Sequence, residues 1–149
     1  MPENESDLHL RVAAVCYRRT PAGPEFLLVR TWDGEWTFPK GMIDPGATEI
    51  ETAETEAWEE AGVRGAIDPR PFATYRADKD SKSSGAIKIQ VAAYLLEVRS
   101  TEPPQENHRK PQWFDPDAAK KALADGRSEK RAREFDRVIS LAVQKISSS

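Results

Sequence analysis

A short segment of the sequence specifies both ends of one helix. Thr48 and Glu51 have the spacing of a capping box, and the turn Pro45-Gly46 comes directly before them. A helix is therefore expected to begin near residue 48. Gly62 stands where such a helix would stop. The segment predicts a helix over about residues 48–61.

Three glutamates of this predicted helix share one face. Glu56, Glu59 and Glu60 stand at i, i+3 and i+4, so their side chains leave the helix within one turn. Like charges this close raise one another's pKa, whereas a bound divalent cation stabilises the ionised forms. A solvated surface is the commoner role of a glutamate-rich helix, but the specified flanks favour a metal site. Mg²⁺ suits it, because magnesium takes oxygen ligands and is usually held by one or two carboxylates plus substrate phosphates; Mn²⁺ is the alternative.

The spacing of the whole segment resembles the Nudix box, G-x5-E-x7-R-E-U-x-E-E-x-G-U, in which U is a bulky aliphatic residue. The positions in register are Gly41, Glu56, Glu59, Glu60, Gly62 and Val63. The stretch 36–41 before the box and the later pair Trp113-Phe114 also resemble the family. The similarity therefore runs from about residue 9 to residue 146.

The resemblance implies a hydrolase that cleaves a pyrophosphate bond in a nucleoside diphosphate linked to another group. It implies that Glu56, Glu59 and Glu60 are the catalytic carboxylates and bind the metal together with the backbone carbonyl of Gly41. Lys40, one residue earlier, would meet a phosphate. The implied fold is α/β (α+β), an α/β/α sandwich with a mixed central sheet.

Two positions depart from the pattern: Ala47 replaces its first Glu and Thr55 replaces its Arg. In the family these residues are thought to support the loop and helix by charge pairing. Loss of one partner of a buried pair costs about 3–5 kcal/mol, whereas loss of both can be nearly neutral. Either the support is rewired, or the domain is catalytically weak and binds a nucleotide or polyphosphate as a sensor. Glu49 is expected to point elsewhere, because two residues of helix rotate a side chain by about 200°.

The remaining sequence predicts strands around this helix and two helices at its end. Strands are expected over residues 9–18, 25–30, 65–77 and 86–98, with a short extended piece at 32–38. Loops are expected at 81–85 and 101–110, and helices at 116–125 and 128–146. One face of the last helix is apolar and is expected to pack on the sheet.

Residues of the predicted loops are candidates for binding substrate. The basic candidates for this role are Lys40, Lys88, Arg109 and Lys110. The cluster 108–110 resembles Nudix subfamilies that act on dinucleoside polyphosphates and on diphosphoinositol polyphosphates. Diadenosine tetraphosphate therefore represents the predicted substrate class, and diphosphoinositol polyphosphates are the alternative.

Other loop and aromatic residues are candidates for secondary roles. A glutamate of the helix or of a loop could serve as general base, and Glu102 and Glu106 are the loop candidates. Trp32, Tyr75 and Trp113 are the aromatic residues that could stack on a base, although packing is the commoner role for each.

Composition limits the partners and the location. A formal net charge of −3 at pH 7 over 149 residues argues against nucleic-acid binding driven by counterion release. No apolar run approaches 18 residues and the acidic start lacks a signal sequence, so a cytoplasmic protein without a membrane partner is expected. We expect one domain over 1–149 with flexible ends at 1–7 and 147–149, as a monomer or homodimer. Cys16 is expected in a core strand.

Overall fold

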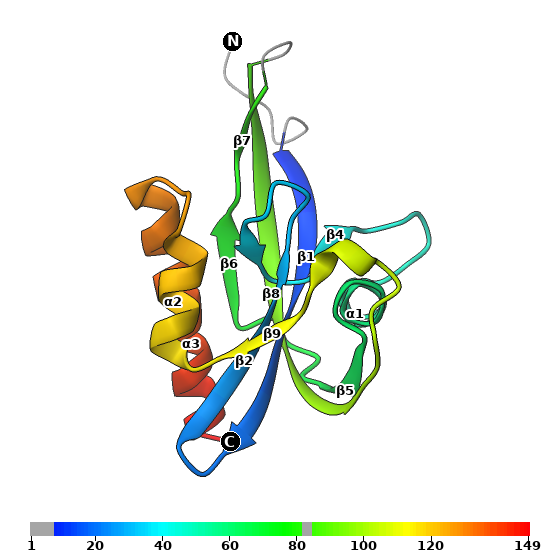
Figure 1. The fold of residues 1–149 in the computed structure, drawn as a ribbon. Helices are drawn as coiled ribbons and strands as arrows, with labels where there is room; N and C mark the ends of the chain where they lie inside the picture. Colours follow the sequence, from blue (N-terminus) through cyan, green and yellow to red (C-terminus); the bar gives the residue numbers. More distant parts are fainter. Residues whose placement is uncertain (1–7, 82–84) are drawn as a thin grey trace.

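The computed structural model describes residues 8–81 and 85–149, which form a mixed sheet with helices on both faces (Figure 1). The strands are β1 (Leu8–Thr20), β2 (Gly23–Arg30), β3 (Trp36–Thr37), β4 (Lys40–Met42), β5 (Val63–Ile67), β6 (Ala73–Arg76), β7 (Lys79–Ser81), β8 (Gly85–Thr101) and β9 (Gln112–Phe114). The helical elements are α1 (Glu49–Glu56), the π-helical turn η2 (Ala57–Ala61), the 3₁₀ turn η3 (Asn107–Arg109), α2 (Pro116–Ala124) and α3 (Glu129–Ser147).

The centre of the sheet is a long parallel pair of strands. β1 lies parallel to β8 in a register that runs from Leu8 opposite Lys88 to Tyr17 opposite Glu97. The other strand pairs among the described residues are antiparallel, including the predicted hairpin of β1 and β2. The expected mixed sheet is thus confirmed.

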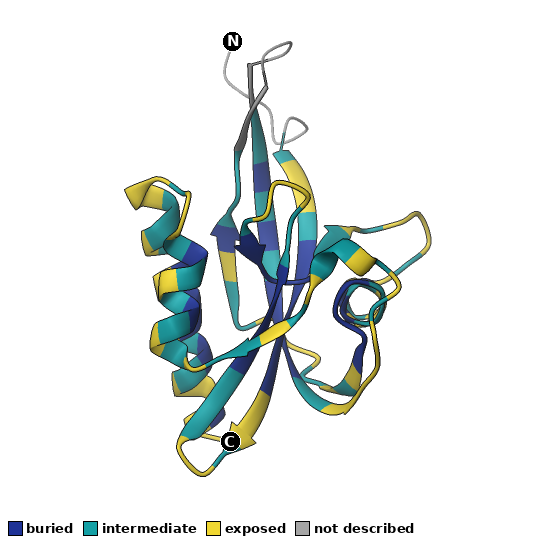
Figure 2. Cartoon of the chain, in the orientation of Figure 1, coloured by how far each residue is buried: buried dark blue, intermediate teal, exposed yellow. Residues whose placement is uncertain are grey.

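The apolar run of β1 is continuous because helices cover both faces of the sheet. Val12, Ala14 and Cys16 belong to the core beneath α1, whereas the side chains between and after them belong to the core beneath α2 and α3. Figure 2 shows the central strands buried between the two helical layers. The predicted α/β/α sandwich is confirmed, and Cys16 is buried in its core strand.

Several predicted elements end at other residues than expected. The predicted strand 65–77 is divided into β5 and β6, and the stretch between them contains Pro69 and Pro71, which cannot donate to a strand ladder. The extended piece 32–38 shrinks to the two residues of β3. The predicted loop 101–110 contains η3. The predicted loop 81–85 includes residues 82–84, which lie outside the described residues.

The last helix packs as its apolar stripe predicts. The stripe residues buried against the sheet are Phe135, Val138, Ile139, Ala142 and Ile146. Ser147 is the last residue of α3, and the backbone amides of Ser148 and Ser149 donate to the carbonyls of Gln144 and Ile146. Flexibility at 147–149 stays a prediction. The first seven residues lie outside the described part of the chain.

A half-buried aspartate, Asp78, ties α3 to β6 and β8, and its loss should weaken the fold in a pH-dependent way. Burial alone would raise the pKa of Asp78, but the amide of Ile89 (2.8 Å) and the guanidinium groups of Arg76 and Arg131 (both 3.2 Å) lower it. A carboxyl whose folded pKa is lowered stabilises the fold above its unfolded pKa, and this contribution is lost as the pH falls through the folded pKa.

We therefore expect Asp78→Asn to reduce the free energy of unfolding by about 1–2 kcal/mol at neutral pH. Urea titrations at pH 7 and at pH 3 measure the effect. The difference from the wild type should shrink at the lower pH, and a difference that stays constant would contradict the ionic origin of the contact.

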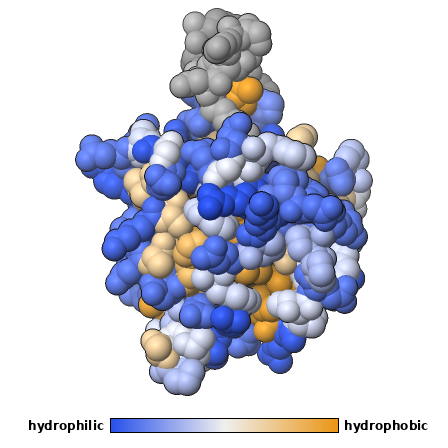
Figure 3. All heavy atoms as spheres, in the orientation of Figure 1, coloured by the Kyte–Doolittle hydropathy of each residue, from blue (hydrophilic) through white to orange (hydrophobic). Residues whose placement is uncertain are grey.

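The face of the molecule seen in Figure 3 is mostly hydrophilic, with apolar side chains gathered near the middle of the view. Within residues 8–81 and 85–149, no helix has both the length and the apolar character that crossing a bilayer requires.

Candidate functional site

The helix that carries the glutamates begins as the sequence predicts. The Thr48 hydroxyl accepts the amide of Glu51 at 3.1 Å, and the Glu51 carboxylate accepts the amide of Thr48 at 3.0 Å. Gly62 ends the helical segment in the left-handed conformation, with φ of 69°. The capping box and the glycine stop are confirmed.

The last turn of this segment differs from the expected α-helix. Residues 57–61 form the π-helical turn η2, and the amide of Gly62 donates to the carbonyl of Ala57, five residues earlier. Such turns interrupt the regular α-helical spacing and are frequent at functional sites. The expectation of a regular α-helix was therefore wrong in the last turn, which contains both Glu59 and Glu60.

The structure brings together two of the three glutamates. Glu60 is 4% exposed, shares a hydrogen bond with Glu56 and accepts the amide of Lys40 at 3.3 Å. Glu59 lies at intermediate burial and repels Glu56 electrostatically. No group of three or more His, Cys, Asp or Glu side chains within the described ranges is arranged to hold a metal.

The electrostatics of the Glu56–Glu60 pair fit a divalent cation. Burial, as the largest cause, together with the hydrogen bond to Glu60 and the charges of Glu60, Glu59 and Glu106, raises the pKa of Glu56 to about 8. Burial also raises the pKa of Glu60, although the hydrogen bond from Glu56 and the charge of Arg109 oppose this. Both shifts reflect negative charge that lacks compensation, and a hard cation with oxygen ligands would supply it.

Gly41 leaves the space that Glu56 occupies. A Cβ at position 41 would overlap the Glu56 carboxylate, whose Cδ would lie 2.5 Å away. Strand β4 holds Gly41 in place, because Gly41 pairs with Val12 of β1. The missing side chain therefore lets a carboxylate lie directly against the backbone of β4.

We expect Gly41→Ala to damage the site while sparing the fold. The overlapping atoms belong to the end of a flexible side chain, so the Glu56 carboxylate can move away at small cost. Affinity for a divalent cation should fall by about 10- to 100-fold, while the melting temperature should change by only a few degrees. Titration calorimetry with Mg²⁺ and thermal melts of the two proteins measure this. Unchanged affinity of the variant would show that the position of Glu56 is unimportant.

The turn η3 brings two further predicted residues to the glutamate pair. The Arg109 guanidinium lies 3.4 Å from Glu60 and 2.9 Å from Glu106, and it donates to the carbonyl of Arg30 at 3.2 Å. Arg109, predicted to bind substrate, thus contacts the carboxylates directly. Of the two loop carboxylates, Glu106 lies at the site, whereas the Glu102 side chain is exposed.

Lys40 lies between two hollows at the surface. One, of about 340 Å³, is lined by Lys40, Glu60, Arg109 and Trp32 among others. The other, of about 510 Å³, shares Lys40, Thr31 and Asp33 with the first. The Lys40 ammonium donates to the Thr37 hydroxyl at 3.1 Å. The predicted phosphate-binding lysine therefore stands where the two hollows meet.

The second hollow contains basic residues that the sequence did not single out. Arg127 and Arg131 line it, at and just after the turn between α2 and α3. In sequence they look like ordinary charges near a helix start, so no local pattern marks them. The predicted binders Lys88 and Lys110 line neither hollow: Lys88 lies in β8 opposite Leu8, and Lys110 is exposed.

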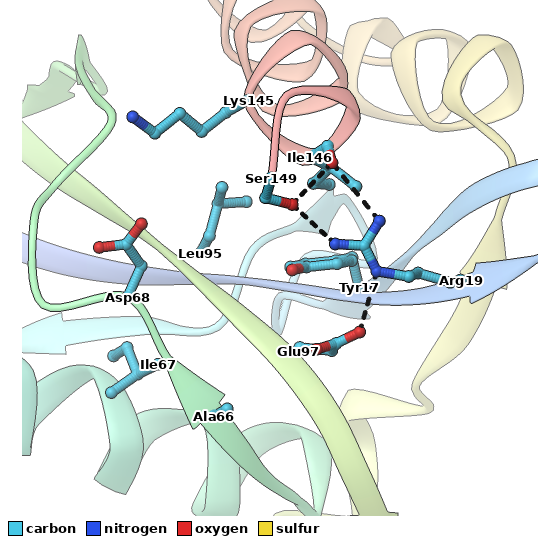
Figure 4. A pocket seen from close by; sticks show the side chains of 10 residues that line it. All are labelled: Tyr17, Arg19, Ala66, Ile67, Asp68, Leu95, Glu97, Lys145, Ile146 and Ser149. Carbon is cyan, nitrogen blue, oxygen red and sulfur yellow. Dashed lines mark hydrogen bonds and ion pairs between the residues drawn. The ribbon is translucent and has the colours of Figure 1, made fainter.

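A third hollow, of about 430 Å³, is lined by none of the glutamates 56, 59 and 60 (Figure 4). The Arg19 guanidinium crosses it to contact Glu97 at 3.1 Å and the Ser149 hydroxyl at 2.8 Å. None of the predicted site residues lines it. We therefore place the candidate active site at the hollows around Lys40.

Helix α1 is tied to the sheet by a contact that involves neither Ala47 nor Thr55. The Tyr94 hydroxyl of β8 donates to the Glu49 carboxylate at 2.7 Å. Burial and this hydrogen bond raise the pKa of Tyr94 to about 12. Thr55 is exposed. The charge pair expected from positions 47 and 55 is absent, and the hydrogen bond between Tyr94 and Glu49 joins the helix to the sheet instead.

Comparison with known proteins agrees with this geometry. A family model described as NUDIX domain matches residues 8–135. An asymmetrical bis(5'-nucleosyl)-tetraphosphatase of Rattus norvegicus is 33% identical over 102 residues, which cover 64% of this chain and 67% of that protein. The Mus musculus protein of the same name is 51% identical over 41 residues, which cover 26% of this chain and 28% of that protein.

Solved structures show the same fold. A binary complex of the C. elegans Ap4A hydrolase has a TM-score of 0.70 at 19% identity, covering 95% of this chain and 99% of that one. The NUDIX domain of Shewanella oneidensis NrtR, complexed with ADP ribose, has a TM-score of 0.68 at 16% identity, covering 93% and 88%. The match to the family model, together with the register of the box from Gly41 to Val63, shows that the chain belongs to the Nudix family of hydrolases.

Proposed function

We propose that this Nudix hydrolase cleaves a pyrophosphate bond in a dinucleoside polyphosphate such as diadenosine tetraphosphate, with Mg²⁺ or Mn²⁺ as cofactor. The observation that carries the proposal is the pairing of the buried Glu60 with Glu56 against Gly41, beside Lys40 and two hollows. The names of the rat and C. elegans relatives support the substrate class. We also propose that residues 1–149 act as one cytoplasmic domain, monomeric or homodimeric, without a nucleic-acid partner.

In the proposed reaction the glutamates would hold the metal. Glu56, Glu59 and Glu60, with the carbonyl of Gly41, are the proposed ligands. A bound divalent cation polarises phosphoryl oxygens and lowers the pKa of bound water. Lys40 would meet a phosphate, and its amide holds Glu60 in place through a hydrogen bond of 3.3 Å.

Proton transfer from the attacking water is assigned to a carboxylate at the site. Glu106 is favoured over Glu102, because Glu106 acts electrostatically on both Glu56 and Glu60. Arg109 orients Glu106 through an ion pair of 2.9 Å. Arg127 and Arg131 of the second hollow would bind the far phosphates of a long substrate.

A second candidate function rests on Ala47 and Thr55: a catalytically weak domain that binds a nucleotide or polyphosphate as a sensor. We favour the enzyme, because the bond between Tyr94 and Glu49 ties α1 to the sheet without the missing charge pair. This supports a rewired rather than a decayed box.

One set of assays separates the candidates. The protein is incubated with Mg²⁺ and diadenosine tetraphosphate, diphosphoinositol polyphosphate or ADP-ribose, and the products are identified by chromatography. Turnover of the dinucleotide supports the proposal, and preferred turnover of the inositol substrate replaces it with the alternative substrate class. Binding without turnover, followed by hydrolysis once Ala47→Glu and Thr55→Arg are introduced together, supports the sensor.

A further inference from the structure

One tryptophan lies exposed at the mouth of the site. The Trp32 side chain is 81% exposed, the highest value among the large apolar residues described. One face of its indole stacks on the imidazole of His108, with ring centroids 3.5 Å apart and planes 12° from parallel. Burial therefore does not explain this residue, and the second face of the indole is open to solvent.

The turn that carries Trp32 is fixed by its own backbone. The amide of Thr31 donates to the carbonyl of Glu35 at 2.8 Å, and the amide of Gly34 donates to the carbonyl of Thr31 at 2.9 Å. The Thr31 hydroxyl also accepts the amide of Glu35 at 3.1 Å. The indole thus stands on a closed turn, which lowers the entropy lost when a ligand stacks on it.

The imidazole of His108, on which the indole stacks, belongs to a turn that contacts the glutamate pair. His108 lies in η3 next to Arg109, which contacts Glu60 and the carbonyl of Arg30. The Nε2 atom of His108 is buried and has no hydrogen-bond partner within the described residues. The imidazole therefore serves as a backing for the indole rather than as part of a polar network.

Among the three aromatic residues considered for base stacking, the structure leaves Trp32 with an open face. Tyr75 is 2% exposed, and the Arg18 guanidinium covers Trp113 at 4.2 Å from its ring centroid. Trp32 also lines the same hollow as Lys40 and Glu60. A base on the indole would therefore lie beside the groups proposed to bind phosphate.

We propose that the open face of Trp32 is the platform on which a nucleobase of the substrate stacks. This inference rests on the proposed function and narrows it, because a purine has a π face that stacks on an aromatic platform, whereas the saturated inositol ring has none. It thereby selects nucleotides over diphosphoinositol polyphosphates. Loss of one base–aromatic stack weakens binding by between about 5- and 100-fold.

Binding measurements test the platform independently of turnover. ADP and inorganic tripolyphosphate are titrated by calorimetry, in Mg²⁺, into the wild type, Trp32→Ala and Trp32→Tyr. We expect Trp32→Ala to weaken ADP binding by about 5- to 100-fold and to leave tripolyphosphate binding unchanged, while Trp32→Tyr restores most of the ADP affinity. Leu10→Ala is the control, because Leu10 is an apolar residue of β1 that is also exposed, at 55%.

Each outcome decides the inference. ADP binding that is absent from the wild type, unchanged in Trp32→Ala, or weakened equally with tripolyphosphate binding would overturn the platform. Hydrolysis of diadenosine tetraphosphate with an unaltered KM in Trp32→Ala would overturn the platform and leave the proposed function standing. Trp32-dependent ADP binding without any hydrolysis would support the platform and overturn the proposed function. Circular dichroism melts confirm that each variant is folded.

Discussion

Glu60→Gln should abolish hydrolysis and at the same time raise the thermal stability of the metal-free protein. Glu60 is the most buried of the three glutamates, at 4% exposure, and it contacts Glu56, Arg109 and the amide of Lys40. Gln has nearly the same shape but cannot supply a charged oxygen to a metal. The rate should therefore fall by about 100-fold or more.

The stability gain follows from the crowding of negative charge. Glu56 and Glu60 both have a raised pKa in the folded state. Their ionisation therefore lowers the free energy of unfolding as the pH rises above their pKa in the unfolded chain, and for Glu56 this loss continues up to the folded pKa of about 8. A neutral amide at position 60 removes the repulsion. The melting temperature in EDTA should rise by about 3 °C, and the gain should grow between pH 4 and pH 8.

Rates in Mg²⁺ and melts in EDTA are measured on the same protein. Glu54→Gln is the matched control, because Glu54 is an exposed glutamate of α1 and its variant should change neither quantity. Retained turnover in Glu60→Gln would exclude Glu60 as a metal ligand. Lost turnover together with lost stability would instead indicate that Glu60 is needed for folding.

Gly62→Ala should cause the largest loss of stability of any alanine variant considered. The residue has φ of 69°, a conformation that costs a side-chain-bearing residue about 1–2 kcal/mol. A Cβ there would also overlap the carbonyl oxygen of Glu102, whose own amide donates to the carbonyl of Gly62 at 2.7 Å. Because the obstacle is backbone, it cannot swing aside as a flexible side chain can.

A comparison of two glycines isolates the overlap. Gly46 also has a positive φ, 86°, but nothing lies within 4 Å of the position of its Cβ. Gly46→Ala should therefore lower the melting temperature by only the conformational cost, about 3–6 °C, whereas Gly62→Ala should lower it by about 10 °C or leave the chain unfolded. Equal shifts in thermal melts would show that Glu102 moves away freely.

Local chemistry made much of this fold predictable from the sequence. The capping box at Thr48 and the glycine at position 62 act on their own neighbours, so the helix ends needed no knowledge of the rest of the chain. The packing of α3 on the sheet was equally predictable, because its apolar residues form a stripe along one face of the helix. The strand predicted over residues 65–77 was wrong for a local reason too, because Pro69 and Pro71 between β5 and β6 cannot donate to a strand ladder.

The candidate site was predictable in its residue types but not in its arrangement. The spacing of Glu56, Glu59 and Glu60 on a regular helix does not indicate which of them is buried. In the structure η2 contains Glu60, which is buried and hydrogen-bonded to Glu56. The contact of Arg109 with Glu60 joins residues from distant parts of the chain, and no sequence spacing encodes it. For the same reason the sequence did not indicate that Arg131 lines the second hollow.

The parallel pairing of β1 with β8 has a consequence for how the chain is made. Residue 8 pairs with residue 88, so the hairpin of β1 and β2 leaves the ribosome long before its other neighbour is synthesised. Until then one edge of an apolar strand has no partner, and contacts between residues so far apart in sequence form slowly. Nascent chains stalled before β8 should therefore be the species most prone to aggregate or to need a chaperone.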